Sequence, residues 1–214
     1  MSKIKMIELT EHHLDIVLSW RNDPKVRENM YTYHEISTEE HQNWFETLSN
    51  DHARKYFVCE LDDELCGLIG YTQIDLVSRS ASWVFYSGDT NKRGIGSMME
   101  VAALDYAFDV MKLHKLNCEV LEFNESVIKF HKKHGFKVEG RFKKHYFKND
   151  KHWDTYRLAI FAKTWLNRRT DIVGHIKGPY SVGKQFHHEF TISDDQIMEF
   201  AKVTGDNNSI HLSD

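Results

Sequence analysis

Apolar and polar positions alternate in several short runs of the chain and recur at helical spacing in others, which predicts a mixture of strands and helices. Alternation predicts strands at residues 5–9, 56–61, 65–74, 83–86, 115–121, 136–147 and 152–161. Helical spacing predicts helices at residues 11–22, 38–48, 94–111 and 124–134. The order β-α-α-β-β-β-α-β-α-β-β predicts an α/β (α+β) fold, in which helices cover a mixed, mostly antiparallel central sheet.

The character of the chain changes near residue 164, where arginines and glycines interrupt the apolar pattern. We therefore expect one domain over residues 1–165, a linker over residues 166–184 and a short further segment over residues 185–214. In that last segment, residues 190–192 suit a strand and Ser193 suits the N-cap of a helix.

Composition excludes several classes of protein. The 214 residues are 41% hydrophobic, include two prolines and carry a formal net charge of −4, which disfavours a disordered chain or a nucleic-acid binder. No apolar run approaches the ~18 residues of a membrane span, and the first residues lack the apolar core of a secretion signal, so we expect a cytoplasmic protein. Neither the three cysteines nor the fourteen histidines form a metal-binding motif, so no metal is expected.

A strand, a glycine-containing loop and a helix follow one another in the middle of the chain. Residues 83–86 suit the strand, and Gly94 and Gly96 open the helix. A helix N-terminus offers unpaired N–H groups to an anion such as a pyrophosphate, and Lys92 and Arg93 add positive charge beside it. Glycines also serve ordinary tight turns, so the loop alone leaves both interpretations open.

A second motif favours the functional interpretation of this loop. Residues 124–136, Asn-Glu-Ser-Val-Ile-Lys-Phe-His-Lys-Lys-His-Gly-Phe, follow the next strand. Together with the Asn91-x-x-Gly94-x-Gly96 loop, this segment resembles the acetyl-CoA-binding half of the GCN5-related N-acetyltransferase (GNAT) superfamily, over about residues 5–162. The resemblance implies a GNAT fold and acetyl-CoA as co-substrate. It implies cofactor contacts at these residues: Phe85, Tyr86, Lys92, Arg93, Gly94, Ile95, Gly96, Ser97 and Asn124.

The sequence departs from the family pattern at two positions. Asn91 stands where the family usually has Gln or Arg. His131 stands where the family often has a tyrosine that acts as general acid. An imidazolium is a competent proton donor near neutral pH. The hypothesis is that His131 protonates the departing thiolate, and the alternative is that it only lines the pocket.

The amine acceptor is expected to bind to the N-terminal part of the domain. Within the superfamily, the segments around Arg21, Tyr31 and His41 resemble the UDP-4-amino-4,6-dideoxy-sugar N-acetyltransferases of pseudaminic acid biosynthesis and also the ribosomal-protein N-acetyltransferases. Arg21 and His41 favour the sugar enzymes, because a nucleotide diphosphate needs cations and a flat partner for its base. Residues 129–151 add eight lysines and one arginine. The general base stays open among Glu60, Glu64, Asp75 and a water chain.

The last 35 or so residues resemble the start of R-specific enoyl-CoA hydratases of the hot-dog fold (MaoC-like). Asp206 and His211 have the spacing of the hydratase dyad, although Ser209 replaces the proline of that family. The strands and long helix that a hot-dog domain needs are missing, so we expect a short, incomplete hot-dog-like segment with a vestigial dyad. A chance helix-and-loop tail is the alternative.

Four functions remain open from the sequence. The favoured one is acetyl transfer to a small-molecule nucleotide sugar, and the second is acetylation of protein N-termini. The others are a CoA-linked fusion with a hydratase domain and a non-catalytic acyl-CoA-binding module. No nucleic-acid or membrane partner is expected, and self-association is left open.

Overall fold

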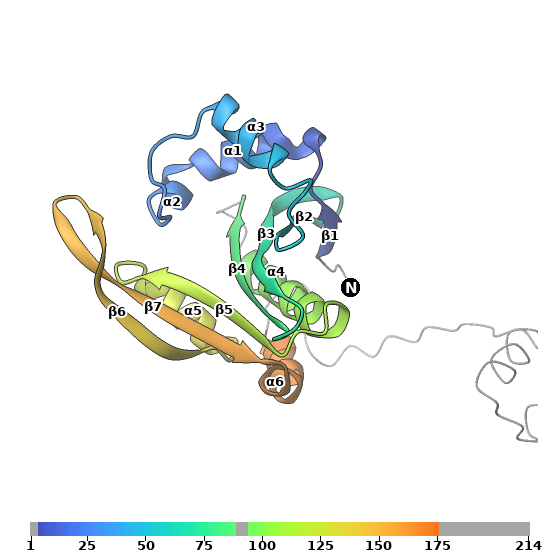
Figure 1. Ribbon diagram of the computed structural model, residues 1–214. Helices are drawn as coiled ribbons and strands as arrows, with labels where there is room; N and C mark the ends of the chain where they lie inside the picture. The colour runs from blue at the N-terminus through green and yellow to red at the C-terminus, as the bar shows by residue number, and fades with distance from the viewer. Residues whose placement is uncertain (1–3, 89–93, 176–214) are drawn as a thin grey trace, which may run out of the picture. The chain divides into compact units, whose positions relative to one another are not determined.

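A single mixed sheet organises the protein, whose computed structural model describes residues 4–88 and 94–175. Its seven strands lie in the order β1-β2-β3-β4-β5-β7-β6 (Figure 1). Only the pair β4 and β5 is parallel among these strands. The strands are β1 (Lys5–Glu8), β2 (Lys55–Leu61), β3 (Glu64–Asp75), β4 (Ser80–Ser87), β5 (Lys115–Leu121), β6 (Lys137–Lys148) and β7 (Lys151–Phe161). The predicted mixed, mostly antiparallel sheet is confirmed.

Helices cover both faces of this sheet (Figure 1). They are α1 (Leu14–Asn22), α2 (Pro24–Arg27), α3 (Thr38–Glu46), α4 (Ile95–Asp105), α5 (Glu125–Lys133) and α6 (Ala162–His175). A short turn of 3-10 helix, Glu11–His13, precedes α1, and a π-helical turn, Tyr106–Val110, extends α4. The Ser37 side chain caps α3 by accepting from the Glu40 N–H at 3.1 Å. Gly135, at φ 106°, supplies the left-handed residue that ends α5.

Alternation along the central strands builds a separate core on each face. On β2 and β3, Phe57 and Ile69 face α4, whereas Val58 and Leu68 face α1 and α3. The larger core also takes in Met99 of α4. Because successive strand residues point to opposite faces, one amphipathic stretch serves both layers.

Helix α6 packs on α4 and is not part of a linker. Trp165 is fully buried, and its Nε1–H donates to Asp105 Oδ1 at 2.9 Å. Arg169 makes two hydrogen bonds to the same carboxylate, at 2.6 and 2.7 Å, and Ile172 is buried. Residues 166–175 are therefore helical where a linker was predicted, because an apolar and arginine-bearing face docks them on α4.

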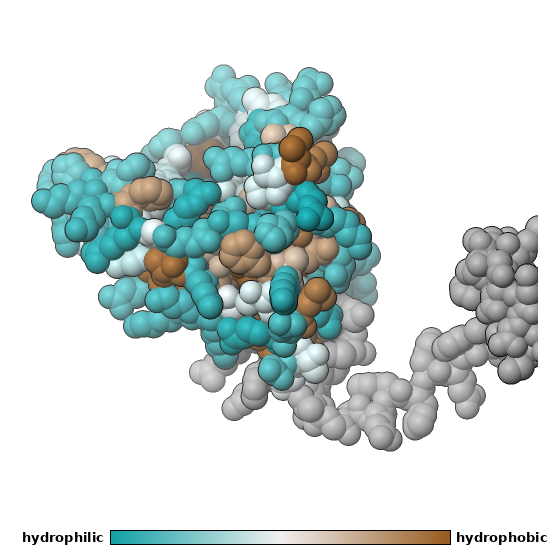
Figure 2. All heavy atoms as spheres, turned by 60° about the horizontal axis from the view of Figure 1, so that its bottom comes forward, coloured by the Kyte–Doolittle hydropathy of each residue, from teal (hydrophilic) through white to brown (hydrophobic). Residues whose placement is uncertain are grey.

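Several predictions concern residues outside the described ranges. These are the rest of the linker, the hot-dog-like segment of residues 185–214 with Asp206 and His211, and the loop residues Asn91, Lys92 and Arg93. Within the described ranges, every helix is too short or too polar to cross a membrane. The face shown in Figure 2 is mostly hydrophilic, and its apolar side chains lie in small separate groups instead of one large patch.

Trp165→Ala should destabilise the domain by about 3–5 kcal/mol, because it removes a large buried ring together with the hydrogen bond to Asp105. Chemical denaturation followed by circular dichroism measures the change. Leu166→Ala is the matched control, since Leu166 is 63% exposed and should change stability by less than about 0.5 kcal/mol. Equal effects of the two substitutions would contradict the packing of α6.

Candidate active site

The central feature of the site is the place where the two parallel strands separate. Strands β4 and β5 pair only at Ser80–Ser82 with Lys115–Asn117. At the last rung, the Asn117 Nδ2 group donates to the Ala81 carbonyl at 3.0 Å. Beyond it the strands splay, and the edge of β4 that faces β5 carries backbone groups without a β5 partner. Backbone groups left unpaired in this way are available to an extended ligand.

A cleft of about 610 Å³ occupies the gap between the strands, and we call it the β4–β5 cleft. Residues of β4, β5, α5 and the segment after α2 line it; they include Met30, Tyr31, Trp83, Phe85, Tyr86, Cys118, Glu119, Asn124 and His131. Of the predicted cofactor residues, Phe85, Tyr86 and Asn124 are therefore brought together here. Asn124 is the N-cap residue of α5.

Gly94, Ile95, Gly96 and Ser97, which are predicted to contact the cofactor, form the N-terminus of α4. Gly94 is its N-cap and has φ 86°, a left-handed conformation that glycine adopts without a steric penalty. A Cβ added to Gly96 would meet only Phe130, at 3.7 Å, so packing within the chain does not require a glycine there. Ile95 is buried in the core, and the space beside Gly96 is compatible with the phosphate interpretation of this helix end.

The hairpin of β6 and β7 is hydrogen-bonded to the segment after α2, part of which lines the β4–β5 cleft. The Tyr146 hydroxyl donates to the Tyr31 carbonyl at 2.8 Å, and Lys148 Nζ donates to the Glu28 carbonyl at 2.6 Å. The Tyr31 hydroxyl reaches across to Glu119 Oε2 at 2.9 Å, and burial raises the pKa of Tyr31 to about 12. Tyr31 therefore stays a neutral hydrogen-bonding group at the wall of the cleft.

A second pocket, of about 290 Å³, adjoins this cleft and shares Met30, Val84 and Tyr86 with it. We call it the Arg21 pocket. Arg21 and His41 line it, so the structure groups these two predicted residues and places Tyr31 in the neighbouring cleft. Two polar atoms in it, Arg21 Nη1 and His41 Nε2, are buried without a hydrogen-bond partner.

Burial shifts the pKa values of both side chains in this pocket. It lowers the pKa of the half-buried Arg21 guanidinium, whose Nη2 donates to the Thr32 carbonyl at 2.6 Å and whose Nη1 is unpaired. Burial likewise lowers the pKa of His41, which bonds the Leu14 backbone and stacks on Trp44 with ring centroids 5.0 Å apart. Its Nε2 atom is consequently an acceptor at neutral pH, in the same pocket as the unpaired Nη1 of Arg21.

His131 lies on α5 at the wall of the β4–β5 cleft, where the sequence places it. Its ring is 4% exposed and its Nδ1 atom lies 3.0 Å from Glu100 Oε1. Burial lowers the pKa of His131, but hydrogen bonds to Cys118 and Glu100 outweigh burial and raise that pKa to about 10. The hydrogen bonds to Cys118 and Glu100 therefore favour the charged form of the His131 ring.

Sequence reasoning missed two carboxylates of the site. Glu119 lines the β4–β5 cleft, where Arg157 Nη1 donates to it at 3.2 Å. Glu100 is buried beneath His131, and its signal in the sequence is a single acidic residue inside the apolar run Met98–Leu104. Among the described residues that line the cleft there is none of the three open candidates for the base, Glu60, Glu64 and Asp75.

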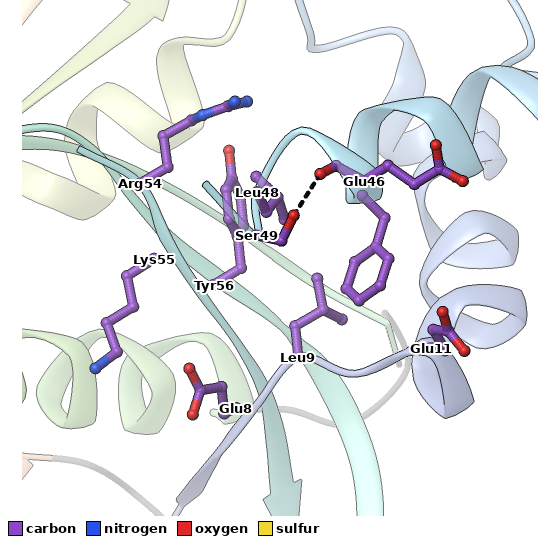
Figure 3. A pocket seen from close by; sticks show the side chains of 10 residues that line it. Glu8, Leu9, Glu11, Glu46, Leu48, Ser49, Arg54, Lys55 and Tyr56 are labelled. Atoms are coloured by element: carbon purple, nitrogen blue, oxygen red, sulfur yellow. Dashed lines mark hydrogen bonds between the residues drawn. The ribbon is translucent and has the colours of Figure 1, made fainter. Parts of the chain in front are cut away.

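A third hollow, of about 330 Å³, lies at the other end of the sheet (Figure 3). Glu8, Leu9, Glu46 and Tyr56 are among its lining residues, and none of the predicted site residues is. It does not border the splayed strands, so we assign no part of the acetyl-transfer site to it. Over the described ranges, no group of three or more His, Cys, Asp or Glu side chains is arranged to hold a metal ion.

Two parallel strands splay apart here, and a helix with a glycine N-cap follows the first of them. This arrangement is typical of acyl-CoA-binding folds. The sequence matches the family described as Acetyltransferase (GNAT) domain over residues 6–156. The chain therefore belongs to the GNAT acetyltransferases. It is an N-acetyltransferase, and acetyl-CoA is its co-substrate.

Individual relatives point to two kinds of acceptor. Acetyltransferase PseH of Campylobacter jejuni is 27% identical over 139 residues, which cover 64% of this chain and 86% of PseH. This match confirms the expected resemblance to the N-acetyltransferases of pseudaminic acid biosynthesis. Spermidine N(1)-acetyltransferase of Escherichia coli is 32% identical over 118 residues, 55% of this chain and 63% of that enzyme.

Solved structures confirm the fold. The crystal structure of spermidine N-acetyltransferase from Vibrio cholerae in complex with CoA and spermine superposes with a TM-score of 0.71. The two chains are 24% identical over 77% of this chain and 99% of that one. A dodecameric structure of the Vibrio cholerae enzyme superposes with a TM-score of 0.66.

The raised pKa of His131 predicts a specific dependence of stability on pH. The folded protein keeps a proton on His131 that the unfolded chain releases above its ordinary pKa of about 6.5. The stabilisation is therefore complete below about pH 6.5 and is lost as pH rises toward 10, by up to about 1.4 kcal/mol per pH unit. Denaturant unfolding between pH 6 and 10 measures this loss.

The double variant Glu100→Gln/His131→Gln is the control, because it removes both members of the buried pair and keeps similar side-chain volumes. Its unfolding free energy should fall less steeply over the same pH range. Parallel curves for the two proteins would contradict the protonated state of His131.

Proposed function

We propose that the enzyme transfers the acetyl group of acetyl-CoA to the 4-amino group of a UDP-amino-dideoxy sugar, the reaction type of pseudaminic acid biosynthesis. The observation that carries the proposal is the Arg21 pocket beside the β4–β5 cleft. Its buried Arg21 Nη1 and His41 Nε2 atoms lack partners, so the pocket has one unused donor on a cation and one unused acceptor. A nucleotide diphosphate offers matching groups, since it combines phosphate oxygens with N–H donors on the base.

Charge favours this acceptor over a polyamine. The acidic residue of the Arg21 pocket is Glu40, and His34 Nε2 already lies 3.0 Å from one of its oxygens. In the β4–β5 cleft, Arg157 and Tyr31 occupy both oxygens of Glu119. A polyamine would therefore meet the Arg21 cation while the nearby carboxylates are engaged, whereas a diphosphate would neutralise that cation.

Shape favours a small molecule over a protein N-terminus. A peptide needs an open groove, but the β6–β7 hairpin is bonded to the segment after α2 through Tyr146 and Lys148. These contacts bridge more than one hundred residues of sequence and hold in place the segment that carries the cleft residues Met30 and Tyr31. A compact acceptor that enters through the Arg21 pocket does not require them to open.

Transfer is direct in this proposal. The neutral amine attacks the thioester carbonyl carbon, the new C–N bond forms and the C–S bond breaks. Unpaired N–H groups on the β5-facing edge of β4 stabilise the negative charge on the carbonyl oxygen. His131 gives a proton to the departing sulfur as general acid. Phe85, Tyr86, Asn124 and the α4 N-terminus hold the acetyl-CoA, together with Lys92 and Arg93 of the loop.

Release of free CoA should be fastest with a UDP-4-amino-4,6-dideoxy sugar when it is compared with spermidine and with an N-terminal peptide at equal concentration. A thiol-reactive dye follows the release, and the acetylated product is confirmed by mass spectrometry. Faster turnover of spermidine or of the peptide would overturn the acceptor assignment. Binding of acetyl-CoA without turnover of any amine would indicate a non-catalytic module.

Arg21→Gln should raise the KM for the nucleotide sugar about 10- to 100-fold, because a charge-assisted hydrogen bond to phosphate is lost. The KM for acetyl-CoA should stay within about twofold, since Arg21 lies outside the β4–β5 cleft. Arg54→Gln is the matched control. It removes an arginine that pairs with Asp51 and lies outside the Arg21 pocket, so it should leave the KM for the sugar unchanged.

His131→Ala should lower kcat by about 10²–10⁴-fold, the usual contribution of a positioned general acid. The effect should appear in kcat more than in the KM for acetyl-CoA, because the proton moves only as the C–S bond breaks. Steady-state kinetics across pH 6–9 measure it. Unchanged rates over this range would reduce His131 to a residue that only lines the cleft.

A further inference from the structure

Glu100 is a charged residue in a place where a charge is costly. It lies on α4 within the larger core, next to Met99 and near Leu104, and its side chain is fully buried. An ionised carboxylate in such surroundings needs a partner of opposite charge and hydrogen bonds to its oxygens. The identity of that partner shows what Glu100 does.

Two histidines one turn apart on α5 approach the carboxylate. His131 Nδ1 lies 3.0 Å from Oε1 and His134 Nδ1 lies 3.1 Å from Oε2. His134 Nδ1 is also 3.0 Å from the Phe130 carbonyl, with which it forms its hydrogen bond. Glu100 Oε2 is left without a hydrogen-bond partner. His131 is therefore the residue that supplies a hydrogen bond and a positive charge to Glu100.

The rest of the His131 environment is mostly apolar. Strand β4 presents Trp83 and Phe85, with ring centroids 5.6 and 5.9 Å from the imidazole, and Phe136 packs at 5.1 Å. The titratable groups that face the ring are Glu100 from α4, Cys118 from β5 and the neighbouring His134 of α5. Both Cys118 and His131 line the β4–β5 cleft.

We propose that Glu100 is a positioning residue for acetyl transfer: its carboxylate holds the His131 ring at Nδ1 and keeps the ring charged, so that the other N–H serves the cleft. The inference rests on the acetyl-transfer part of the proposed function and is independent of which amine is the acceptor. Cys118 sulfur is a weak hydrogen-bond acceptor. A thiolate of CoA is a stronger one and replaces it when the reaction proceeds.

The proton and electrons balance in this step. The C–S bond breaks with its electron pair on the CoA sulfur, and that sulfur takes the proton from the cleft-facing nitrogen of His131. His131 becomes neutral, and the Glu100 carboxylate stays ionised. The proton that the attacking amine loses returns the imidazole to its charged form through solvent.

Helix α4 connects the Glu100–His131 pair to the predicted cofactor site. Gly96 and Glu100 are four residues apart on α4 and so lie on the same face of the helix. That face meets α5, since a Cβ at Gly96 would contact Phe130 and Glu100 contacts His131. The helix whose N-terminus receives the pyrophosphate thus also carries the residue that orients the acid.

Glu100→Gln tests the proposal, because glutamine keeps the shape and the acceptor oxygen but removes the charge. The kcat at pH 8.5 should fall about 10- to 100-fold, and the basic limb of the kcat profile should move to lower pH. The KM for acetyl-CoA should change little. Any amine that the wild-type enzyme turns over serves as acceptor, so a wrong acceptor assignment does not affect the test.

His134→Gln is the matched control, since it disturbs the other side of the same carboxylate without touching His131. It should lower the thermal unfolding temperature and leave the basic limb of the kcat profile in place. If Glu100→Gln only reproduces the behaviour of His134→Gln, the carboxylate has a structural role alone and the proposal is overturned.

A titration of the histidine ring resonances by NMR, with the His131 signals assigned from the His131→Ala spectrum, needs no acceptor. In the wild-type protein the His131 ring should remain doubly protonated at pH 8.5, and in Glu100→Gln it should be neutral at that pH. A neutral His131 ring in the wild-type protein at pH 8.5 would falsify the inference, whatever the kinetics show.

Discussion

The loss of pairing between β4 and β5 is the constraint on which the rest of the site depends. The parallel hydrogen-bond ladder between β4 and β5 stops after Ser82 and Asn117. The Asn117 side chain bonds the Ala81 carbonyl at that point, so the last rung is reinforced before the strands part. The separation leaves backbone donors on β4 and makes room for the β4–β5 cleft. The proposed oxyanion stabilisation depends on these donors, and His131 lies at the cleft because α5 begins shortly after β5.

A buried pair of opposite charges, Glu100 and His131, lies beside this cleft. Glu100 and His131 come from different helices, and each would be costly to bury alone. Together they hold α4 against α5 and keep a proton donor at the cleft. The usual family tyrosine needs no such support, since a phenol is neutral and keeps its proton near pH 7. A histidine in that position loses its proton near neutral pH unless a carboxylate retains it, which gives a physical reason for the acidic residue inside an apolar helix.

Much of the fold could be predicted because its signals are local. The hairpin turns at Asp62-Asp63 and Asn149-Asp150 have positive φ at both central residues, as short polar side chains in two-residue turns allow. The Ser37 cap and the Gly135 stop are likewise readable from neighbouring residues. The partners of Glu100, Trp165 and Glu119 could not be predicted, because each lies far away in sequence. The 166–175 segment was mistaken for a linker for the same reason: its docking on Asp105 is a tertiary contact.

The Arg21 pocket and the β4–β5 cleft share Met30, Val84 and Tyr86. In the proposed function, an acceptor bound by Arg21 would therefore lie next to β4. A cation and a neutral imidazole with unused hydrogen-bonding atoms are stable only if other contacts compensate for their burial, or if a ligand completes them. His41 stacks on Trp44 and bonds the Leu14 backbone, and its Nε2 atom is unpaired. In the proposed function, this atom and Arg21 Nη1 are the groups that a polar, anionic acceptor would contact.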